Sequence, residues 1–306
     1  MQNDEIAKKT SEIMHVLHEM VSDDSISKKR LVGQISTNYL KVSDDFFTGK
    51  ICADLGCGTN AFLTSNLLDL GAKHVHALDY NEKFIKPATE RFSQTAQYNG
   101  RWTFKVGTLL DLPYEDSFFD FVACQGVIHH TSDPLKSLSE TARILKTGGI
   151  SYITLPGSQG VLGRLVMELL RDEYQNNQFF NEIISNELSV ELILNWIDYL
   201  LEELDENSNN TPAARQFLLS LKELIDIDLI QTIKDRCMAP TYETYTEESI
   251  SESLTAAGFS SWYRTSKRPV YENIRMVLAP IYDNFKHPLA RLLFGQGGVF
   301  NIVAIK

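Results

Sequence analysis

The stretch Ile51–Phe62 (ICADLGCGTNAF) limits the possible folds of this chain more than any other. Its apolar start predicts a buried strand that ends at Asp54, and Gly56–Gly58 predict a tight turn. The residues from Thr59 onward predict the first turn of an amphipathic helix. Glycines suit such a turn because a side chain would block the close approach of a ligand to the backbone. The free N–H groups of the helix start suit an anionic group, so the stretch predicts a strand–turn–helix unit with a ligand at its turn.

The order of the acid and the glycines narrows the kind of ligand. The third glycine of the dinucleotide-binding fingerprints is replaced here by Asn60, a residue type that tolerates a positive φ angle. The string D-L-G-C-G resembles motif I of the class I S-adenosylmethionine (SAM)-dependent methyltransferases. The resemblance implies that the turn packs against the methionine and ribose parts of SAM. The cofactor-binding residues that it implies in this stretch are Asp54, Gly56, Cys57, Gly58 and Asn60. The alternative is a strand–turn–helix unit without a ligand.

Asp79 ends the second predicted strand, which covers residues 74–79. An acid at this place, roughly 20 residues past the first turn, can accept hydrogen bonds from both ribose hydroxyls. The resemblance therefore implies that Asp79 is the ribose ligand, and we count the adjacent Tyr80 with it. The alternative is a surface acid that caps the next helix. His74 and His76 face one side of the same strand, and we interpret them as packing residues.

Two later strings resemble the same family. Residues 107–120, GTLLDLPYEDSFFD, are similar to its pattern G-D-A-x-x-L-P-F-x-D-x-S-F-D, in which the two residues after the glycine contact the adenine. These two are Thr108 and Leu109 here, and Thr108 supplies a weaker hydroxyl where the family has a carboxylate. Residues 143–149, RILKTGG, are similar to R-x-L-K-P-G-G. Gln125, at the carboxyl end of the fourth predicted strand, faces the ligand crevice of such a sheet and is a further candidate cofactor-binding residue.

The ordered motifs predict the fold class. We expect an α/β protein with a Rossmann-like, seven-stranded, mostly parallel sheet, an antiparallel last strand, and a helical insertion after strand five. The SAM-binding core is predicted at residues 49–157 and 242–306, an N-terminal helical cap at residues 1–48, and the insertion at residues 158–241. The predicted helices cover residues 5–20, 27–40, 59–70, 82–98, 161–174, 178–184, 190–204, 212–236 and 247–257.

Two segments leave a choice of roles. The insertion lies beside the crevice, where it would act as a substrate-selecting lid, and the alternative is a dimerisation element. The connection Ser266–Gly297 is unusually long. Its cationic and aromatic residues would bind an anionic acceptor or be solvated, and they are Lys267, Arg268, Tyr271, Arg275 and Arg291.

His129 and His130 follow the fourth predicted strand, where the family keeps residues that face the methyl acceptor. A histidine with a pKa near 6.5 suits the removal of a proton from the acceptor. The resemblance implies that His130, or next His129, is a catalytic base. The alternative is a histidine that only orders the loop. A metal site built with Asp133 is less well supported, so we expect no metal.

Composition bears on partners and location. The chain has 306 residues and a net charge of −11, which argues against a large nucleic-acid footprint. Its start, MQNDEIAKKTS, lacks the apolar region of a signal peptide, and no run reaches the roughly 20 apolar residues of a membrane span. The four cysteines lack paired or zinc-like spacing and are expected to be reduced thiols in a cytoplasmic protein.

The leading hypothesis is a SAM-dependent methyltransferase that acts on a small-molecule acceptor, similar to the ubiquinone/menaquinone-biosynthesis and natural-product groups. One alternative is a tRNA-modifying enzyme, because wobble-uridine methyltransferases share the L-P-Y-x-D and V-I-H-H strings. Another is a SAM-binding interaction protein without catalysis. A homodimer through the insertion is possible in each case.

Overall fold

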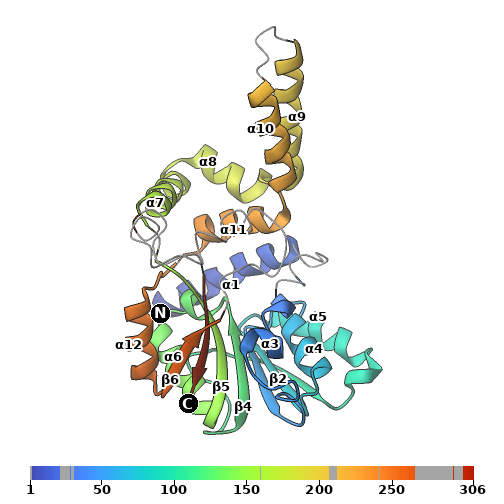
Figure 1. Cartoon of the computed structure of the whole chain (residues 1–306), viewed down its shortest axis with the longest axis vertical. Helices are drawn as coiled ribbons and strands as arrows, with labels where there is room; N and C mark the ends of the chain where they lie inside the picture. Colours follow the sequence, from blue (N-terminus) through green and yellow to red (C-terminus); the bar gives the residue numbers. More distant parts are fainter. Residues whose placement is uncertain are drawn as a thin grey trace.

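The computed structural model describes residues 2–20, 28, 31–158, 160–206, 212–240, 242–265, 292 and 299–306. Its centre is a seven-stranded sheet with the strand order β3-β2-β1-β4-β5-β7-β6 (Figure 1). The strands are β1 (Ile51–Leu55), β2 (His74–Asp79), β3 (Trp102–Val106), β4 (Phe119–Gln125), β5 (Leu145–Pro156), β6 (Ser261–Arg264) and β7 (Val299–Ile305).

Strands β1 to β5 are parallel to one another, and β7 is antiparallel to both of its neighbours, β5 and β6. The order of the strands reverses direction between β1 and β4, so the carboxyl ends of these two strands border the crevice in which such sheets bind ligands. The predicted seven-stranded sheet with an antiparallel last strand is confirmed.

Helices cover both faces of the sheet because each face of a buried parallel sheet carries apolar side chains. One face packs on α6 (Pro134–Ile144) and α12 (Glu247–Ala257), which also contact each other. The other face packs on α3 (Thr37–Leu40), α4 (Phe62–Asp69) and α5 (Glu82–Ser93). The fully buried side chains between these layers include Phe119 and Tyr152.

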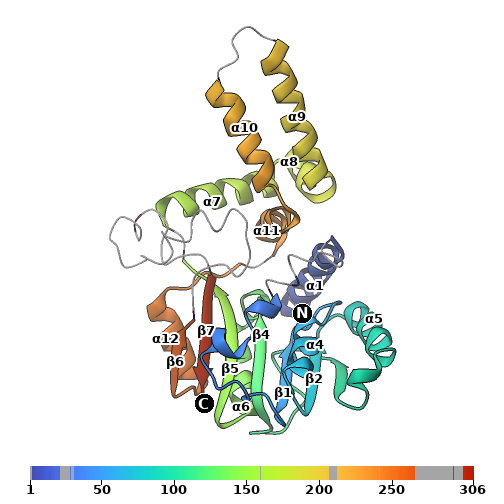
Figure 2. The same ribbon diagram turned by 45° about the vertical axis from the view of Figure 1, so that its right-hand side comes forward.

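The carboxyl edge of the sheet is covered by a further layer of helices. It consists of α1 (Gln2–Met20), α7 (Val161–Asn176) and α11 (Ile227–Met238), and α11 contacts the other two. Beyond this layer, α9 (Val190–Glu206) and α10 (Pro212–Leu224) form an antiparallel pair that stands away from the sheet (Figure 2). Between α7 and α9 lie the short α8 (Gln178–Glu182) and the π-helix η3 (Ile183–Glu187).

Two helices that were predicted to be continuous are interrupted in the structure. The helix predicted at residues 212–236 is broken after Leu224, because the Asp226 side chain accepts a hydrogen bond from the Leu229 N–H and starts α11. The helix predicted at residues 27–40 lies partly outside the described residues. It is interrupted at residues 34–36, where Ser36 becomes the N-cap of α3.

The turn after β1 also differs in detail from the prediction. Helix α4 begins at Phe62 rather than at Thr59, and the left-handed residue before it is Ala61 (φ 43°). Asn60 does not have a positive φ angle, so its tolerance for one is not used. The fifth strand begins at Leu145, five residues before its predicted start.

The cysteines are reduced in the structure, as the sequence predicts. All four cysteines are free thiols, and three are buried. In the part of the chain that the structure describes, no helix has the length and the apolar content needed to span a bilayer. The five cationic and aromatic residues of Ser266–Gly297 lie outside the described residues.

Candidate functional site

The glycine turn after β1 leaves no room for a side chain at Gly56. The N–H groups of Gly56 and Cys57 donate to the Leu78 carbonyl of β2 at 2.7 and 3.2 Å, which closes the turn onto the neighbouring strand. Gly56 has a φ of +76°, and a Cβ added to it would lie 2.3 Å from Cγ2 of Val127. The positive φ angle and the clash with Val127 both require glycine at position 56. The motif therefore determines the backbone path of the turn.

Asp79 is joined to this turn. Its Oδ2 accepts a hydrogen bond from the Gly58 N–H at 2.9 Å, and its Oδ1 accepts one from the Asn81 N–H at 3.0 Å. Burial raises the pKa of this carboxyl group, and the backbone hydrogen bonds oppose that shift. The cap of α5 is Asn81 rather than Asp79. The capping alternative for Asp79 is therefore wrong, and its carboxylate stays beside the glycine turn.

Asp54, the last acid before the glycines, lies deeper. It is 1% exposed, and its Oδ2 accepts a hydrogen bond from the Thr64 hydroxyl of α4 at 2.7 Å. Burial raises its pKa to about 7, against the effect of the Thr64 hydrogen bond. Asp54 thus ties β1 to α4 beneath the turn, while its contact with a cofactor stays a prediction.

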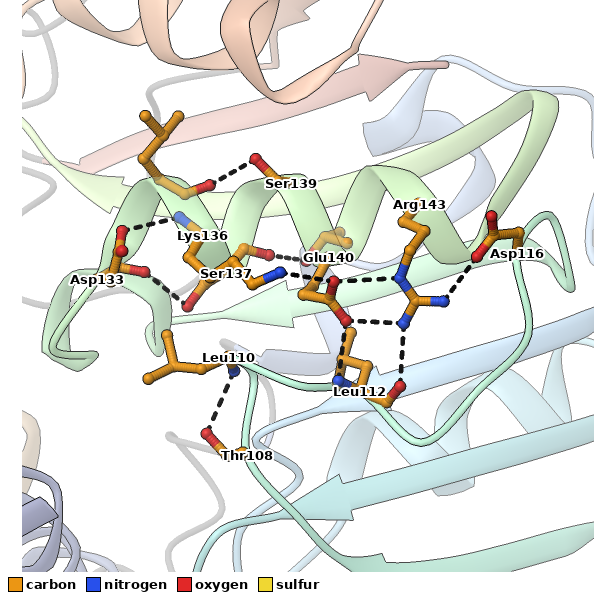
Figure 3. Close-up of polar contacts among 12 residues, drawn as sticks. Thr108, Leu110, Leu112, Asp116, Asp133, Lys136, Ser137, Ser139, Glu140 and Arg143 are labelled. Carbon is orange, nitrogen blue, oxygen red and sulfur yellow. Dashed lines mark hydrogen bonds and ion pairs between the residues drawn. The ribbon is translucent and has the colours of Figure 1, made fainter.

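A charged clamp on α6 holds the loop of residues 107–118 (Figure 3). Glu140 accepts a hydrogen bond from the Leu112 N–H at 3.0 Å, and Arg143 donates to Glu140 at 2.7 Å and to the Leu112 carbonyl at 3.0 Å. Arg143 also pairs with Asp116 at 2.8 Å. The Arg143 hydrogen bond lowers the pKa of Glu140 to about 2. The arginine of the R-I-L-K-T-G-G string is therefore a positioning residue for the predicted adenine loop.

Thr108 and Leu109 lie on this loop, directly after β3. Gly107 donates from its N–H to the Asp79 carbonyl at 2.9 Å, which places the loop beside the glycine turn. The Thr108 hydroxyl accepts a hydrogen bond from the Leu110 N–H at 3.2 Å, and the Leu109 side chain is buried in the core. The Thr108 oxygen keeps a second lone pair, so one acceptor at this place is retained.

The carboxyl end of β4 forms the other side of the site. Gln125 donates through Nε2 to Oε1 of Gln34, which also accepts from the Tyr152 hydroxyl at 3.2 Å. The next N–H, that of Gly126, donates to the Thr154 hydroxyl at 2.7 Å. Gln34 was not predicted as a site residue, because it precedes the motifs and belongs to no recognisable pattern.

The two candidate catalytic histidines lie on the short helix η2 (Ile128–His130) after β4. Both are buried, and their ring centroids are 4.0 Å apart. Tyr242 packs edge-on against both rings, at 5.8 Å from His129 and 6.2 Å from His130. Nε2 of His130 lies 3.5 Å from Oδ1 of Asp235 on α11. Burial, together with the neighbouring His130, lowers the pKa of His129 well below its ordinary value.

Orphaned polar atoms show what kind of ligand this site fits. Among the described residues, the buried atoms Thr59 Oγ1, Gln125 Oε1 and His129 Nδ1 have no hydrogen-bond partner. The Gln125 amide oxygen is an acceptor and the Thr59 hydroxyl can both donate and accept; they flank the end of β4 and the glycine turn. Buried polar atoms are ordinarily satisfied, so the site fits a polar ligand that has a hydrogen-bond donor for Gln125 Oε1.

The structure brings most of the predicted residues to one edge of the sheet. Asp54, Asp79 and Gln125 lie at the carboxyl ends of β1, β2 and β4, whereas Gly56–Gly58 and the histidine pair follow β1 and β4. Tyr80 is 44% exposed beside Asp79. The carbonyl of Asn60 accepts a hydrogen bond from Arg91 of α5, so this residue belongs to the outer wall of the turn.

His74 and His76 have the packing roles that were expected for them. Nε2 of His74 lies 2.9 Å from the Thr103 hydroxyl, and His76 packs edge-on against Tyr114, Phe118 and Phe119. Within the described ranges, no group of three or more His, Cys, Asp or Glu side chains has the arrangement of a metal site.

Comparison with known proteins agrees with this geometry. Residues 53–153 match the family model described as "Methyltransferase domain". The tRNA U34 carboxymethyltransferase of Campylobacter fetus subsp. fetus is 32% identical over 108 residues, which cover 34% of this chain and 36% of that protein. The demethylmenaquinone methyltransferase of Listeria monocytogenes is 29% identical over 97 residues, which cover 31% of this chain and 40% of that protein.

The match to each of these curated relatives spans well under half of the relative's own length. Among solved structures, that of PKMT2 from Rickettsia typhi superposes with a TM-score of 0.54 and 15% identity. It covers 88% of this chain and 52% of that one, and at this identity it supports the fold alone.

Proposed function

We propose that this chain, whose residues 53–153 are a methyltransferase domain of the class I SAM-dependent family, transfers a methyl group from SAM to a small-molecule acceptor. One observation carries the proposal. The hydrogen bond from the Gly58 N–H to Asp79 sets a buried carboxylate directly beside the glycine-rich turn. This is the arrangement that a ligand with an adjacent ribose and amino-acid part requires.

SAM is the cofactor of this domain class, and the residues of the site fit it. The Asp79 carboxylate would accept hydrogen bonds from the ribose hydroxyls of SAM, and the unpartnered Gln125 Oε1 would accept one from its ammonium group. The glycine turn would hold the backbone of its methionine part, and Thr108 and Leu109 would border its adenine. When bound, SAM supplies a methyl group that its sulfonium activates for direct displacement.

The role of the protein in the reaction is to align the acceptor and to remove its proton. Alignment of reacting groups at about 3–3.5 Å supplies a large part of enzymatic rate enhancement. His130 is the proposed base because it follows β4 at the carboxyl edge, where Nε2 of its ring lies 3.5 Å from Oδ1 of Asp235. His129 stays neutral, since burial lowers its pKa, and it is the second candidate.

The residues that pack over the two histidines favour a small acceptor. Tyr242, directly after the insertion, packs on both rings, and Asp235 of the insertion lies beside His130. Helix α11 lies between the pair and the outer hairpin, which is formed by α9 and α10 (Figure 1). The net charge of −11 also opposes the phosphate contacts on which RNA binding depends. The tRNA substrates in the names of some relatives belong to proteins that this chain matches over the core only.

The experiment is methyl transfer from labelled SAM into a cell extract that is then separated into metabolite, RNA and protein fractions. We expect label in the metabolite fraction with the wild type and much less with Asp79→Asn at the same low SAM concentration. Label in RNA would overturn the small-molecule proposal in favour of tRNA modification. Binding of SAM without label in any fraction would contradict catalysis and support a SAM-binding interaction protein.

We also propose that two copies associate through the outer hairpin. Leu192, Trp196 and Tyr199 are exposed along one side of α9, at a spacing that places them in a single stripe, and Trp196 is 59% exposed. A stripe on a hairpin that stands clear of the sheet can meet its own copy about a twofold axis, as most soluble homodimers do (Figure 2). Light scattering should find a dimer that Trp196→Glu dissociates and Glu202→Gln does not, and a monomeric wild type would refute this.

A further inference from the structure

We propose that Gln34, in the N-terminal segment, is a positioning residue that fixes the side-chain amide of Gln125. Its effect is to leave the Gln125 oxygen open to the amino group of SAM, so this inference rests on the proposed function. The two residues are 91 positions apart in sequence, yet Nε2 of Gln125 donates a hydrogen bond to Oε1 of Gln34. The segment before the glycine motif then contributes to recognition of the cofactor as well as to packing.

The two ends of the Gln125 amide have different chemistry. Its oxygen only accepts hydrogen bonds, and its NH₂ group only donates them. Because Oε1 of Gln34 is also an acceptor, it binds the NH₂ end of Gln125 and excludes the oxygen end. Oε1 of Gln125 is consequently buried without a hydrogen-bond partner among the described residues. Buried acceptors are ordinarily satisfied, so this oxygen indicates a ligand that brings a donor.

The oxygen of Gln34 is itself held by the sheet. The hydroxyl of Tyr152, a fully buried residue of β5, lies 3.2 Å from Oε1 of Gln34 and 3.2 Å from Oδ1 of Asn301 on β7. A hydroxyl between two amide oxygens acts as a donor to them. Oε1 of Gln34 therefore meets donors from Tyr152 and Gln125, one for each of its lone pairs.

The backbone on both sides of this contact is fixed. Next to Gln34, the Ile35 side chain is 1% exposed, and the Ile35 carbonyl accepts a hydrogen bond from the Asn66 side chain of α4 at 2.7 Å. Gln125 is the last residue of β4 and pairs with Thr154 of β5. The amide contact thus joins two rigid parts of the molecule, as a preorganised binding group requires.

This arrangement determines which ligand group the amide favours. An amide oxygen favours an ammonium group, which carries donors only, whereas an amide turned over would present its NH₂ group and favour a carboxylate. Since Gln34 holds the amide before any ligand binds, the complex loses less free energy in ordering it. Removal of the Gln34 oxygen should therefore weaken the preference for an ammonium group more than the affinity for the rest of the cofactor.

The first test follows the side-chain NH₂ group of Gln125 by NMR in the full-length protein without a ligand. We expect slow hydrogen exchange of this group in wild type and in Gln34→Glu, whose carboxylate is also an acceptor. We expect this protection to be lost in Gln34→Met, which keeps the size of the side chain without its amide. Asn38→Met, which replaces an exposed amide on α3, should leave the exchange unchanged. Equal exchange in wild type and Gln34→Met would overturn the proposal.

The second test compares two thioethers of adenosine by calorimetry, one with an aminopropyl chain and one with a propyl chain. They differ by the ammonium group alone. We expect wild type to bind the aminopropyl compound at least about tenfold more tightly, as a hydrogen bond to a charged group predicts. This ratio should fall at least about threefold in Gln34→Met, while the affinity for the propyl compound stays within about twofold of wild type. The ratio should persist in Asn38→Met and persist or increase in Gln34→Glu, whose charge also attracts the ammonium group.

The pattern across the variants separates a positioning role from a structural one. An equal loss of affinity for both compounds in Gln34→Met would show a merely structural role. A wild type without a preference, which Gln34→Glu then acquires, would show that the amide has the opposite orientation. Either result overturns the proposal. Binding of neither compound by the wild type would instead refute the proposed function, while the exchange of the Gln125 amide would still decide whether Gln34 orients it.

Discussion

Oδ2 of Asp79 and the N–H of Gly58 are joined by a buried 2.9 Å hydrogen bond between the ends of two adjacent strands. The acid that follows β2 and the turn that follows β1 therefore move as one unit. A ligand that binds the carboxylate is held against the turn at the same time, and a change at either residue alters both contacts.

Asp79→Asn should weaken SAM binding while the fold is kept. Asparagine retains one acceptor oxygen but loses the charge, and a hydrogen bond to a charged group contributes about 1.5–3 kcal/mol. The dissociation constant from calorimetry should therefore rise roughly 10–100-fold. Asp45→Asn changes an exposed acid before β1 and serves as the control with unchanged affinity. Equal affinities of Asp79→Asn and wild type would exclude Asp79 as the ribose ligand.

Gly56→Ala should destabilise the protein more than Gly49→Ala. Both glycines have a positive φ, +76° and +73°, so both variants cost about 1–2 kcal/mol of backbone strain. Only the Cβ at position 56 meets Val127, which adds about 1–3 kcal/mol of overpacking. Urea denaturation of the two variants measures the difference.

The double variant Gly56→Ala/Val127→Ala tests the cause. It should recover part of the loss, because the added methyl group then has space. If the double variant is no more stable than the sum of the two single losses predicts, the steric explanation is wrong.

Asp54→Asn should change how stability depends on pH. The pKa of Asp54 is about 7 in the folded protein and about 3.9 in an unfolded chain. Between these values the folded state holds a proton that the unfolded state has released. This contribution to stability is complete below about pH 4 and is lost as the pH rises through about 7, by at most about 1.4 kcal/mol per pH unit.

The measurement is the free energy of unfolding of wild type and Asp54→Asn at pH 5, 6 and 7. The advantage of wild type over the variant should shrink as the pH increases. A difference that is constant over this range would show that Asp54 is ionised throughout.

Glu140→Gln should loosen the loop of residues 107–118. It should also remove a pH dependence of stability whose sign is opposite to that of Asp54. The pKa of Glu140 is lowered to about 2 by its Arg143 hydrogen bond, from about 4.3 in an unfolded chain. Its contribution is present above about pH 4 and is lost as the pH falls through about 2. At pH 7 we expect a loss of about 1–3 kcal/mol in thermal or urea unfolding. Lys136→Gln, which removes the half-exposed partner of Glu140, should cost under about 1 kcal/mol.

The core of the site was predictable because its residues lie next to strand ends that short motifs identify. Asp79 and Gln125 follow apolar runs, and the carboxyl ends of parallel strands meet at one edge. Asp235 was not predictable, since it lies in an amphipathic helix with the composition of any other. Its position depends on how α11 packs against α1, α7 and η3, which no local pattern encodes.

The helix boundaries that were wrong have a related cause. Apolar residues continue at helical spacing on both sides of Asp226, and no glycine or proline there indicates the end of a helix. Only its capping hydrogen bond shows that two helices meet there. Similarly, the glycine motif indicated that a positive φ angle would fall on Asn60, whereas Ala61 is the left-handed residue in the structure.

Strand β7 lies between β5 and β6, although it comes last of the three in the chain. During synthesis on the ribosome, β5 therefore has no partner on one side until residues 299–305 have emerged. An unpaired strand edge is a template for association with other chains. The edge of β5 therefore stays unpaired in the nascent protein while the insertion is being synthesised. Chaperone binding to the nascent chain should be greatest in that interval and should end when β7 pairs with β5.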